Sequence, residues 1–165
     1  MAEPLYDQVM QQLEQAVGLY YRLILVVAPR GAGKTVALQE VAARTGALVM
    51  NVNLALSQRM LELTERQRSL RVPRLLEEIA GQTDREIVVL DNLEILFDVA
   101  LKLDPLRLLQ GLARHRTVVA AWNGSIEGDY MTYAVPGHPE YRRYPVRDFL
   151  VARPEGSTGR AEKYY

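Results

Sequence analysis

The stretch Leu23-Ile-Leu-Val-Val-Ala-Pro-Arg-Gly-Ala-Gly-Lys-Thr-Val-Ala37 decides the fold of this chain. Its first five residues are apolar, as expected of a strand that is buried on both faces in a parallel sheet. A turn of small residues follows, and Lys34-Thr35 opens a predicted helix. The pattern is that of a phosphate-binding loop with one departure, because Ala28 stands where the usual form has its first glycine. An ordinary glycine turn before a helix is the alternative.

This loop pattern carries a specific chemistry for a triphosphate. Gly31 and Gly33 let the backbone curl so that successive N–H groups point inward, and the helix start adds its free N–H groups and positive dipole end. Lys34 supplies a cation for the β- and γ-phosphates, and the Thr35 hydroxyl can bind Mg²⁺. We expect the tightest bends at Gly31 and Gly33, so that Ala28 needs no positive φ. The expected nucleotide-binding residues are Pro29, Arg30, Gly31, Ala32, Gly33, Lys34, Thr35 and Val36.

Composition narrows the class of protein. A chain of 165 residues with 48% hydrophobic residues is expected to form one globular domain with a sizeable core. The chain has 20 basic residues (lysine and arginine) and 20 acidic residues (aspartate and glutamate). Its net charge is therefore zero and does not steer it to DNA or to anionic membranes. The absence of cysteine excludes disulfides, thiolate zinc sites and thiol catalysis, and two histidines do not favour a histidine metal site.

The amino terminus predicts where the protein resides. It has no basic region followed by an apolar run, as a signal peptide would, and no apolar run reaches membrane-spanning length. We therefore expect a cytoplasmic protein that binds no membrane. With its neutral charge, we also expect no strong independent binding to nucleic acid.

Strands and helices are expected to alternate along the chain. Apolar residues at helical spacing predict an N-terminal helix over residues 4–19. Further strands are expected over 47–52, 85–92 and 117–122, and further helices over 35–44, after Ser57 and after Asp104. This alternation predicts right-handed βαβ units, and so an α/β fold whose mostly parallel sheet has helices on both faces.

Several helix features have more than one interpretation. Ser57 is the expected cap of the arginine- and glutamate-rich helix, and Pro73 is expected to break or restart it. Asp104 and Pro105 are expected at the cap and first turn of the next helix. The mixed charges after Ser57 are typical of a solvated face, with a partner or nucleic-acid surface as the alternative. The N-terminal helix is expected to serve in packing, or else to place Tyr6 against a nucleotide base.

Polar residues end two of the predicted strands. Asp91 follows the apolar run 87–90, which is the Walker B form that delivers a carboxylate towards Mg²⁺. Asn123 ends the strand 117–122 and is similar to the sensor residue that contacts the attacking water or γ-phosphate in AAA+ and related ATPases. Ligands of parallel sheets bind at the carboxyl ends of the strands, so both residues are expected beside the phosphate loop. The alternatives are a helix cap for Asp91 and an ordinary Asn-Gly turn for Asn123.

The Walker B segment departs from the usual form. In many such ATPases a glutamate directly follows the aspartate and positions water, whereas here that place holds Asn92 and the next acid is Glu94. If the chain turns into a helix or tight loop there, Glu94 can return to the same mouth of the sheet. The expected catalytic residues are Lys34, Asp91, Glu94 and Asn123, and the expected Mg²⁺ ligands are Thr35 and Asp91.

From Ser125 onward the composition changes, and tyrosines recur in a segment that also contains proline and glycine. We expect a strand-loop-strand unit over 129–153, with strands at 130–135 and 148–153, and a polar tail over 154–165. The P-loop domain is then one unit over 1–153, with its core at 21–124 and no helical lid domain. Arg142 and Arg143 lie where AAA+-like proteins often place an arginine that reaches a neighbour's γ-phosphate, with ordinary surface arginines as the alternative. On the first interpretation we expect nucleotide-dependent self-association.

Three blocks together carry a resemblance to a known family. They are the phosphate loop, the block Leu90-Asp-Asn-Leu-Glu-Ile-Leu-Phe97 and the block Tyr133-Ala-Val-Pro-Gly-His-Pro-Glu-Tyr-Arg-Arg-Tyr144. Over most of residues 5–150 the chain resembles BrxF, the family of small P-loop proteins of type 3 BREX phage-defence systems. The last block is the distinctive one. The resemblance implies a nucleotide-binding component of a bacterial antiviral system, acting with a methyltransferase, a phosphatase-like protein, a helicase and a larger ATPase.

These observations favour an ATP- and Mg²⁺-binding domain with an AAA+/ASCE-like core, which hydrolyses ATP slowly in an oligomer or with other BREX proteins. A non-catalytic ATP-binding switch or adaptor is the main rival, because Asn92 stands in place of the usual glutamate. A small-molecule kinase and a DNA-binding subunit are further rivals, disfavoured by the lack of an arginine-rich lid and by the neutral charge.

Overall fold

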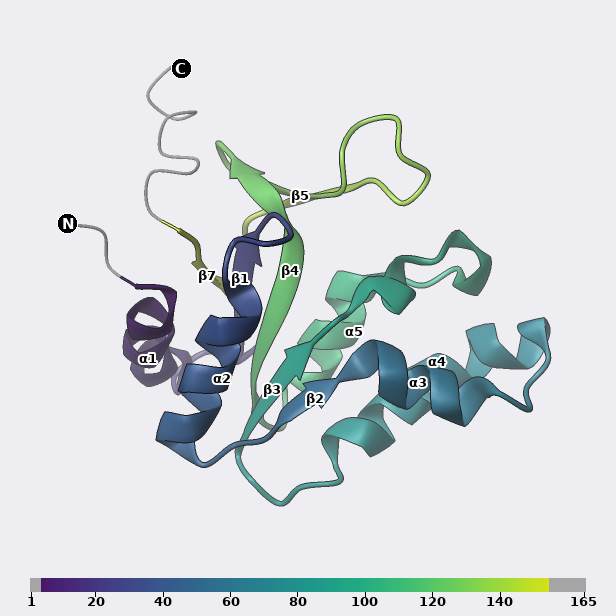
Figure 1. Cartoon of the computed structure of the whole chain (residues 1–165), viewed down its shortest axis with the longest axis horizontal. Coiled ribbons are helices and arrows are strands. Elements are labelled where there is room, and N and C mark those ends of the chain that lie inside the picture. The colour runs from purple at the N-terminus through teal and green to yellow at the C-terminus, as the bar shows by residue number, and fades with distance from the viewer. Residues whose placement is uncertain (1–3, 155–165) are drawn as a thin grey trace.

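The computed structural model describes residues 4–154, and a parallel sheet forms its centre (Figure 1). The strands lie in the order β2 (Val49–Asn51), β3 (Ile87–Asp91), β4 (Thr117–Glu127), β1 (Leu23–Ala28) and β7 (Leu150–Ala152), and each neighbouring pair is parallel. All six residues of β1 are buried, as the apolar run predicts, because the sheet is covered on both faces. The predicted α/β class is therefore confirmed.

Helices cover the two faces in two groups. One face carries α1 (Leu5–Ala16) and α2 (Lys34–Thr45), and the other carries α3 (Val52–Met60), α4 (Glu65–Ala80) and α5 (Pro105–Leu112). Alternate residues of β1 divide between the two cores: Leu23 and Leu25 face one group, and Ile24 and Val26 face the other. No helix within residues 4–154 combines the length and the apolar character that a membrane span requires.

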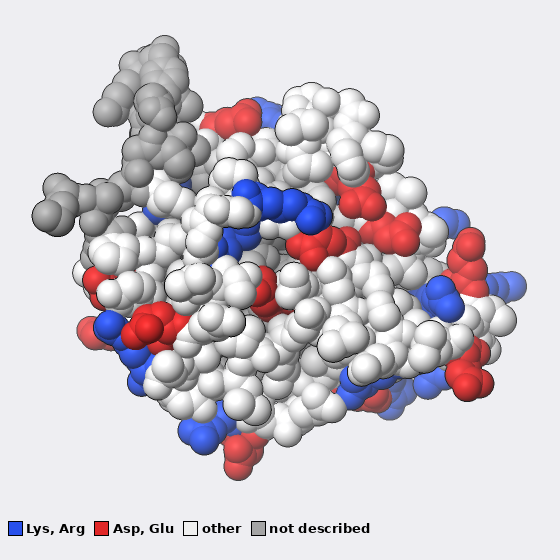
Figure 2. Space-filling model, viewed as in Figure 1, with Lys and Arg blue, Asp and Glu red and all other residues white. Residues whose placement is uncertain are grey.

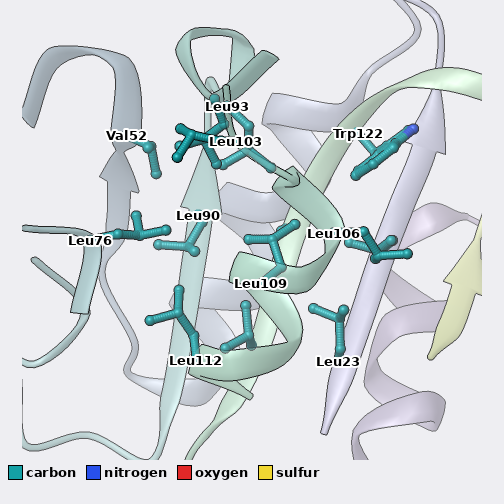
Figure 3. Packing of buried hydrophobic residues seen from close by; sticks show 14 of the residues in the cluster. Leu23, Val52, Leu76, Leu90, Leu93, Leu103, Leu106, Leu109, Leu112 and Trp122 are labelled. Carbon is teal, nitrogen blue, oxygen red and sulfur yellow. The ribbon is translucent and has the colours of Figure 1, made fainter. Parts of the chain in front are cut away.

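Leucines of α5 fill the core on the second face. Leu106, Leu109 and Leu112 recur at helical spacing and are buried against the sheet. Figure 3 shows them beside Leu90 of β3 and Leu23 of β1. A fully buried leucine contributes roughly 2 kcal/mol by leaving water, so this short helix is held to the sheet by its apolar side. As predicted, Asp104 caps α5 by accepting from Arg107 N at 3.3 Å, and Pro105 is its first residue.

The boundaries of α3 and α4 correct two predictions. Ser57 lies inside α3, and Asn51 caps that helix by accepting from Leu54 N at 3.0 Å.

Pro73 lies inside α4 rather than at a break, and the break falls before Thr64, which forms a capping box with Gln67. Pro73 is tolerated because it faces solvent, where water can satisfy the carbonyl that loses its partner, while the opposite side of α4 is held in the core.

The N-terminal helix serves in packing. It ends at Ala16, somewhat before the predicted end, and two of its glutamines donate to backbone carbonyls beside β7: Gln8 to Arg153 O at 2.8 Å and Gln12 to Val151 O at 2.7 Å. The Arg44 guanidinium lies 4.5 Å from the centroid of the Tyr6 ring. Arg44 belongs to the last turn of α2, at the opposite end of that helix from Lys34, so Tyr6 is not placed beside the phosphate loop.

The segment after residue 122 corrects the predicted strands. β4 does not end at Asn123-Gly124 but continues to Glu127, where it pairs antiparallel with β5 (Tyr130–Tyr133). β5 pairs in turn with β6 (Arg142–Pro145), a strand that the sequence analysis missed. The last predicted strand exists as β7 and pairs parallel with β1. The hairpin β5–β6 is thus an antiparallel extension of β4.

Gly124 explains why an Asn-Gly pair can stand inside this strand. A Cβ at residue 124 would lie 1.7 Å from the carbonyl oxygen of Thr132 on β5. The same oxygen accepts a hydrogen bond from Trp122 Nε1 at 3.0 Å. Gly124 is therefore required by the close approach of two backbones and not by a turn.

We predict that Gly124→Ala lowers the free energy of unfolding by about 3 kcal/mol or more, because backbone must move to admit the methyl group. The matched control is Gly111→Ala in α5, where no atom beyond the adjacent backbone of the helix lies within 4 Å of the added Cβ. It is expected to stabilise the protein by about 0.5–1 kcal/mol. Urea unfolding of both variants measures the difference, and a Gly124→Ala protein as stable as the wild type would contradict this account.

Candidate functional site

The phosphate loop leaves the carboxyl end of β1 and opens α2. Gly31 and Gly33 have φ values of 79° and 90°, in the left-handed region that favours glycine. Ala28, the departure from the usual pattern, is the last residue of β1 and has no positive φ. The prediction that the bends fall at the two glycines is confirmed. A backbone with these bends at the start of a helix directs N–H groups towards an anion.

Lys34 is buried at the base of the loop, with 7% of its surface exposed. Its Nζ donates to the carbonyl oxygens of Ala28 and Pro29, both at 2.8 Å. Burial lowers the pKa of Lys34, and the negative charges of Asp91 and Glu94 oppose that shift. The ammonium is thus held on backbone carbonyls, which phosphate oxygens can replace as stronger, charged acceptors.

Asp91 and Thr35 meet beneath the loop. Thr35 Oγ1 donates to Asp91 Oδ2 at 2.8 Å, while Asp91 Oδ1 accepts from Asn92 N at 2.9 Å. Within residues 4–154, no group of three histidine, cysteine, aspartate or glutamate side chains could hold a metal ion. Nucleotide-bound Mg²⁺ instead takes one or two protein oxygens and completes its shell with phosphates and water. The hydroxyl and carboxylate oxygens of Thr35 and Asp91 fit that role.

Glu94 returns to the same mouth of the sheet. The chain bends after Asp91 because Asn92 adopts a left-handed φ of 56°, and a short 3₁₀ helix, η1 (Glu94–Phe97), follows. Glu94 Oε1 accepts from Asn53 Nδ2 at 2.7 Å, and Oε2 accepts from Asn123 Nδ2 at 2.6 Å. The condition set by the sequence for Glu94, a tight turn after the strand, is met. Both carboxylate oxygens are held by side-chain amides.

Asn53 is the residue of this site that the sequence analysis missed. It lies just past the end of β2, and its Oδ1 accepts from Ile95 N at 2.7 Å. Its backbone N–H also donates to Asn92 O at 2.9 Å, so Asn53 is tied to residues 92–95 by three hydrogen bonds. The available signal was positional, because Asn53 directly follows the predicted strand 47–52, as Asn123 directly follows the predicted strand 117–122.

These groups surround a hollow of about 440 Å³. Its lining residues are Arg30, Gly31, Gly33, Lys34, Thr35, Val36, Asp91, Asn92, Glu94 and Asn123. Figure 2 shows this face hollowed near the end of β1, with basic and acidic groups at its rim. Of the predicted nucleotide-binding residues, Pro29 and Ala32 do not line it. The strand register explains the convergence, because Ala28 pairs with Asn123 and Asn51 pairs with Asp91.

A second hollow, of about 480 Å³, adjoins the first. Arg30 and Asn123 line both, and the second is completed by Pro29, Gly124, Ser125, Ala134 and Val135. It therefore lies between the phosphate loop and the hairpin.

The hairpin is fixed to the site by aromatic stacking. The Tyr133 ring lies parallel to that of Phe97, at the end of η1, with centroids 3.4 Å apart. Burial, with a smaller contribution from the Glu94 charge, raises the pKa of Tyr133 to about 12. The Tyr133 hydroxyl is therefore protonated at neutral pH.

Neither of the two candidate trans arginines lines the phosphate hollow of its own chain. Arg142 Nη2 donates to the carbonyl oxygen of Leu103 at 2.8 Å. The Arg143 guanidinium is exposed and lies 3.5 Å from the centroid of the Tyr130 ring. Arg142 is thus engaged in holding β6, and Arg143 is the more available of the two to a neighbouring chain.

Comparison with known proteins gives matches among solved structures but none among sequence families. No protein-family model matches the chain, and no curated protein matches it. Among the solved structures that match is that of C. elegans PCH-2, with 16% sequence identity and a TM-score of 0.43. The match covers 90% of this chain and 41% of the other, so this chain spans less than half of that protein's length. The sheet order, the loop after β1 and the carboxylate at the end of β3 are those of a P-loop NTPase core.

Proposed function

We propose that this chain binds ATP with Mg²⁺ and hydrolyses it slowly, as one component of a larger assembly. The observation that carries the proposal is the hydrogen bond between Thr35 and Asp91 beneath the phosphate loop, with Glu94 facing the same hollow. A hydroxyl and a carboxylate so joined, beside a buried lysine, are the parts that a nucleoside triphosphate and its metal require. When bound, Mg²⁺ would neutralise charge that develops on the phosphates.

Each protein group has a distinct part in the proposed reaction. The loop N–H groups and Lys34 bind the phosphates, and Val36, an apolar residue that is 69% exposed at the hollow, is available to the nucleoside. Water forms the new bond to the γ-phosphorus while the bond to the bridging oxygen breaks, and ADP leaves with the electron pair. Glu94 orients the water and accepts its proton, and Asn123 holds Glu94 in place.

The same contacts favour one alternative, an ATP-binding switch without turnover. Glu94 has both oxygens engaged by Asn53 and Asn123, and Asn92 occupies the usual place of the water-positioning glutamate. Neither carboxylate oxygen of Glu94 is then free of a protein partner to orient an attacking water. In this alternative ATP changes the shape of the site for a partner without being cleaved.

Phosphate release by the purified full chain distinguishes the two. We expect slow, Mg²⁺-dependent release from the wild type and loss of the Mg²⁺ dependence in Asp91→Asn, which keeps the shape of the side chain but removes the charge. Asp84→Asn, at an exposed aspartate away from the hollow, is the matched control and should behave as wild type. An Asp91→Asn protein that retains full Mg²⁺-dependent turnover would contradict the assignment of this site.

The wider role that we propose is as a cytoplasmic component of a BREX phage-defence system, acting with other BREX proteins. The support for this part is the sequence resemblance over the phosphate loop, residues 90–97 and residues 133–144. Self-association that depends on nucleotide is part of the same proposal, with Arg143 as the residue that would reach a neighbour.

A further inference from the structure

Arg30 is a cation at the phosphate hollow with no partner in the described part of the chain. It is exposed on the loop, and within residues 4–154 it forms no hydrogen bond or ion pair. By contrast, Lys34 is held by two carbonyls and Arg142 by one. A flexible arginine without a partner, beside a site built for anions, is available to a ligand.

The position of Arg30 in the hollow indicates which part of the ligand it meets. Arg30 and Asn123 line both hollows, so they mark the end of the phosphate site that borders the hairpin. Val36 lines only the first hollow and lies further along α2, on the side where the nucleoside is expected. The last phosphate of a bound triphosphate therefore falls at the Arg30 end, next to Glu94 and Asn123.

The charges around this end of the hollow support the same placement. Glu94 and Asp91 contribute negative charge to its walls, and Lys34 is the other basic side chain that lines it. Burial lowers the pKa of Lys34, the charges of Asp91 and Glu94 oppose that shift, and the positive charge of Arg30, which lines the same hollow, adds to it. Adding a phosphate between Lys34 and Arg30 would relieve their repulsion.

We propose that Arg30 is a further catalytic residue, which binds the γ-phosphate in its own chain and stabilises the charge that develops there as the phosphoryl group transfers. This inference rests on the proposed binding of ATP. A planar guanidinium can donate two parallel hydrogen bonds to phosphate oxygens, which a lysine cannot.

The test compares ligands that differ only at the γ position. Calorimetry with ATP, with ADP, and with ADP plus aluminium fluoride is run on the wild type, Arg30→Ala, Arg30→Lys and Arg71→Ala. We expect Arg30→Ala to lower the affinity for ATP roughly 10-fold and to leave the affinity for ADP within about twofold of the wild type. We also expect this variant not to bind the complex of ADP with aluminium fluoride, which mimics the transition state. Arg30→Lys should recover part of the ATP affinity but not the binding of ADP–aluminium fluoride. Arg71→Ala, at an exposed arginine on α4, should match the wild type.

Turnover gives a second measurement. Where the wild type hydrolyses ATP, Arg30→Ala should lower kcat on the order of 1000-fold, with a much smaller change in KM. If the wild type binds ATP, and Arg30→Ala binds both ATP and ADP–aluminium fluoride as well as the wild type does, this inference is wrong. The proposed function would still stand in that case. Wild-type protein that binds no nucleotide would overturn both.

Discussion

Replacing Lys34 with alanine is expected to weaken ATP binding roughly 100-fold while leaving the binding of adenosine unchanged. The Nζ of Lys34 sits on the carbonyls of Ala28 and Pro29, within the curve of the phosphate loop. Phosphate oxygens bound there accept charge-assisted hydrogen bonds from this ammonium. Adenosine has no phosphates, so its binding does not depend on these hydrogen bonds. Calorimetry with both ligands measures the two affinities.

Two checks make this result interpretable. Lys102→Asn removes an exposed lysine outside the hollow, and asparagine tolerates the left-handed φ of 53° at that position, so this variant should bind ATP as wild type does. The thermal unfolding temperature of Lys34→Ala shows whether the variant stays folded after the carbonyls of Ala28 and Pro29 lose their hydrogen-bond donor. Unchanged ATP affinity in a folded Lys34→Ala protein would contradict the phosphate-loop assignment.

Glu94→Gln is expected to lower kcat about 100-fold and to leave the ATP dissociation constant within about threefold. The substitution removes the proton acceptor but keeps the shape of the side chain. Asn53 is fixed by its bond from Ile95 N, so it must still donate to the remaining oxygen of residue 94. Asn123 can rotate its amide to face the new NH₂ group with its oxygen. The site therefore stays assembled, and the loss is confined to the chemical step.

Steady-state turnover at saturating ATP, together with equilibrium binding, measures this prediction. Glu62→Gln, at an exposed glutamate outside the hollow, is the matched control. If Glu94→Gln has the same kcat as the wild type, Glu94 has no catalytic role. A wild type that is inactive even with its partners would favour the ATP-switch alternative.

The parts of the fold that could be predicted from sequence are those governed by local chemistry. The apolar run of β1 is buried on both faces, the bends fall at Gly31 and Gly33, and Asp104 caps α5. In each case a short stretch of residues carries the signal by itself. The aspartate after an apolar strand was predictable for the same reason, since a carboxylate at the end of a buried strand must lie at the edge of the sheet.

The parts that could not be predicted depend on contacts between distant segments. Asn123-Gly124 has the composition of a turn, but the backbone of β5 passes so close that only glycine fits within the strand. Pro73 is a helix breaker by itself, but the buried side of α4 outweighs it. Asn53 has no motif around it, and its role follows only from the pairing that brings β2 beside β3.

The short outer strands limit how the sheet can grow. The two strands at the ends of the parallel order, β2 and β7, have three residues each, whereas the interior strand β4 has eleven. The outer strand of the hairpin, β6, carries the exposed Arg143 and ends in Pro145, which has no N–H to donate. Charge, proline and short length at an edge all oppose the addition of a foreign strand. In the described part of the chain these outer strands disfavour edge-to-edge pairing, so we expect assembly through side-chain contacts rather than through a continued sheet.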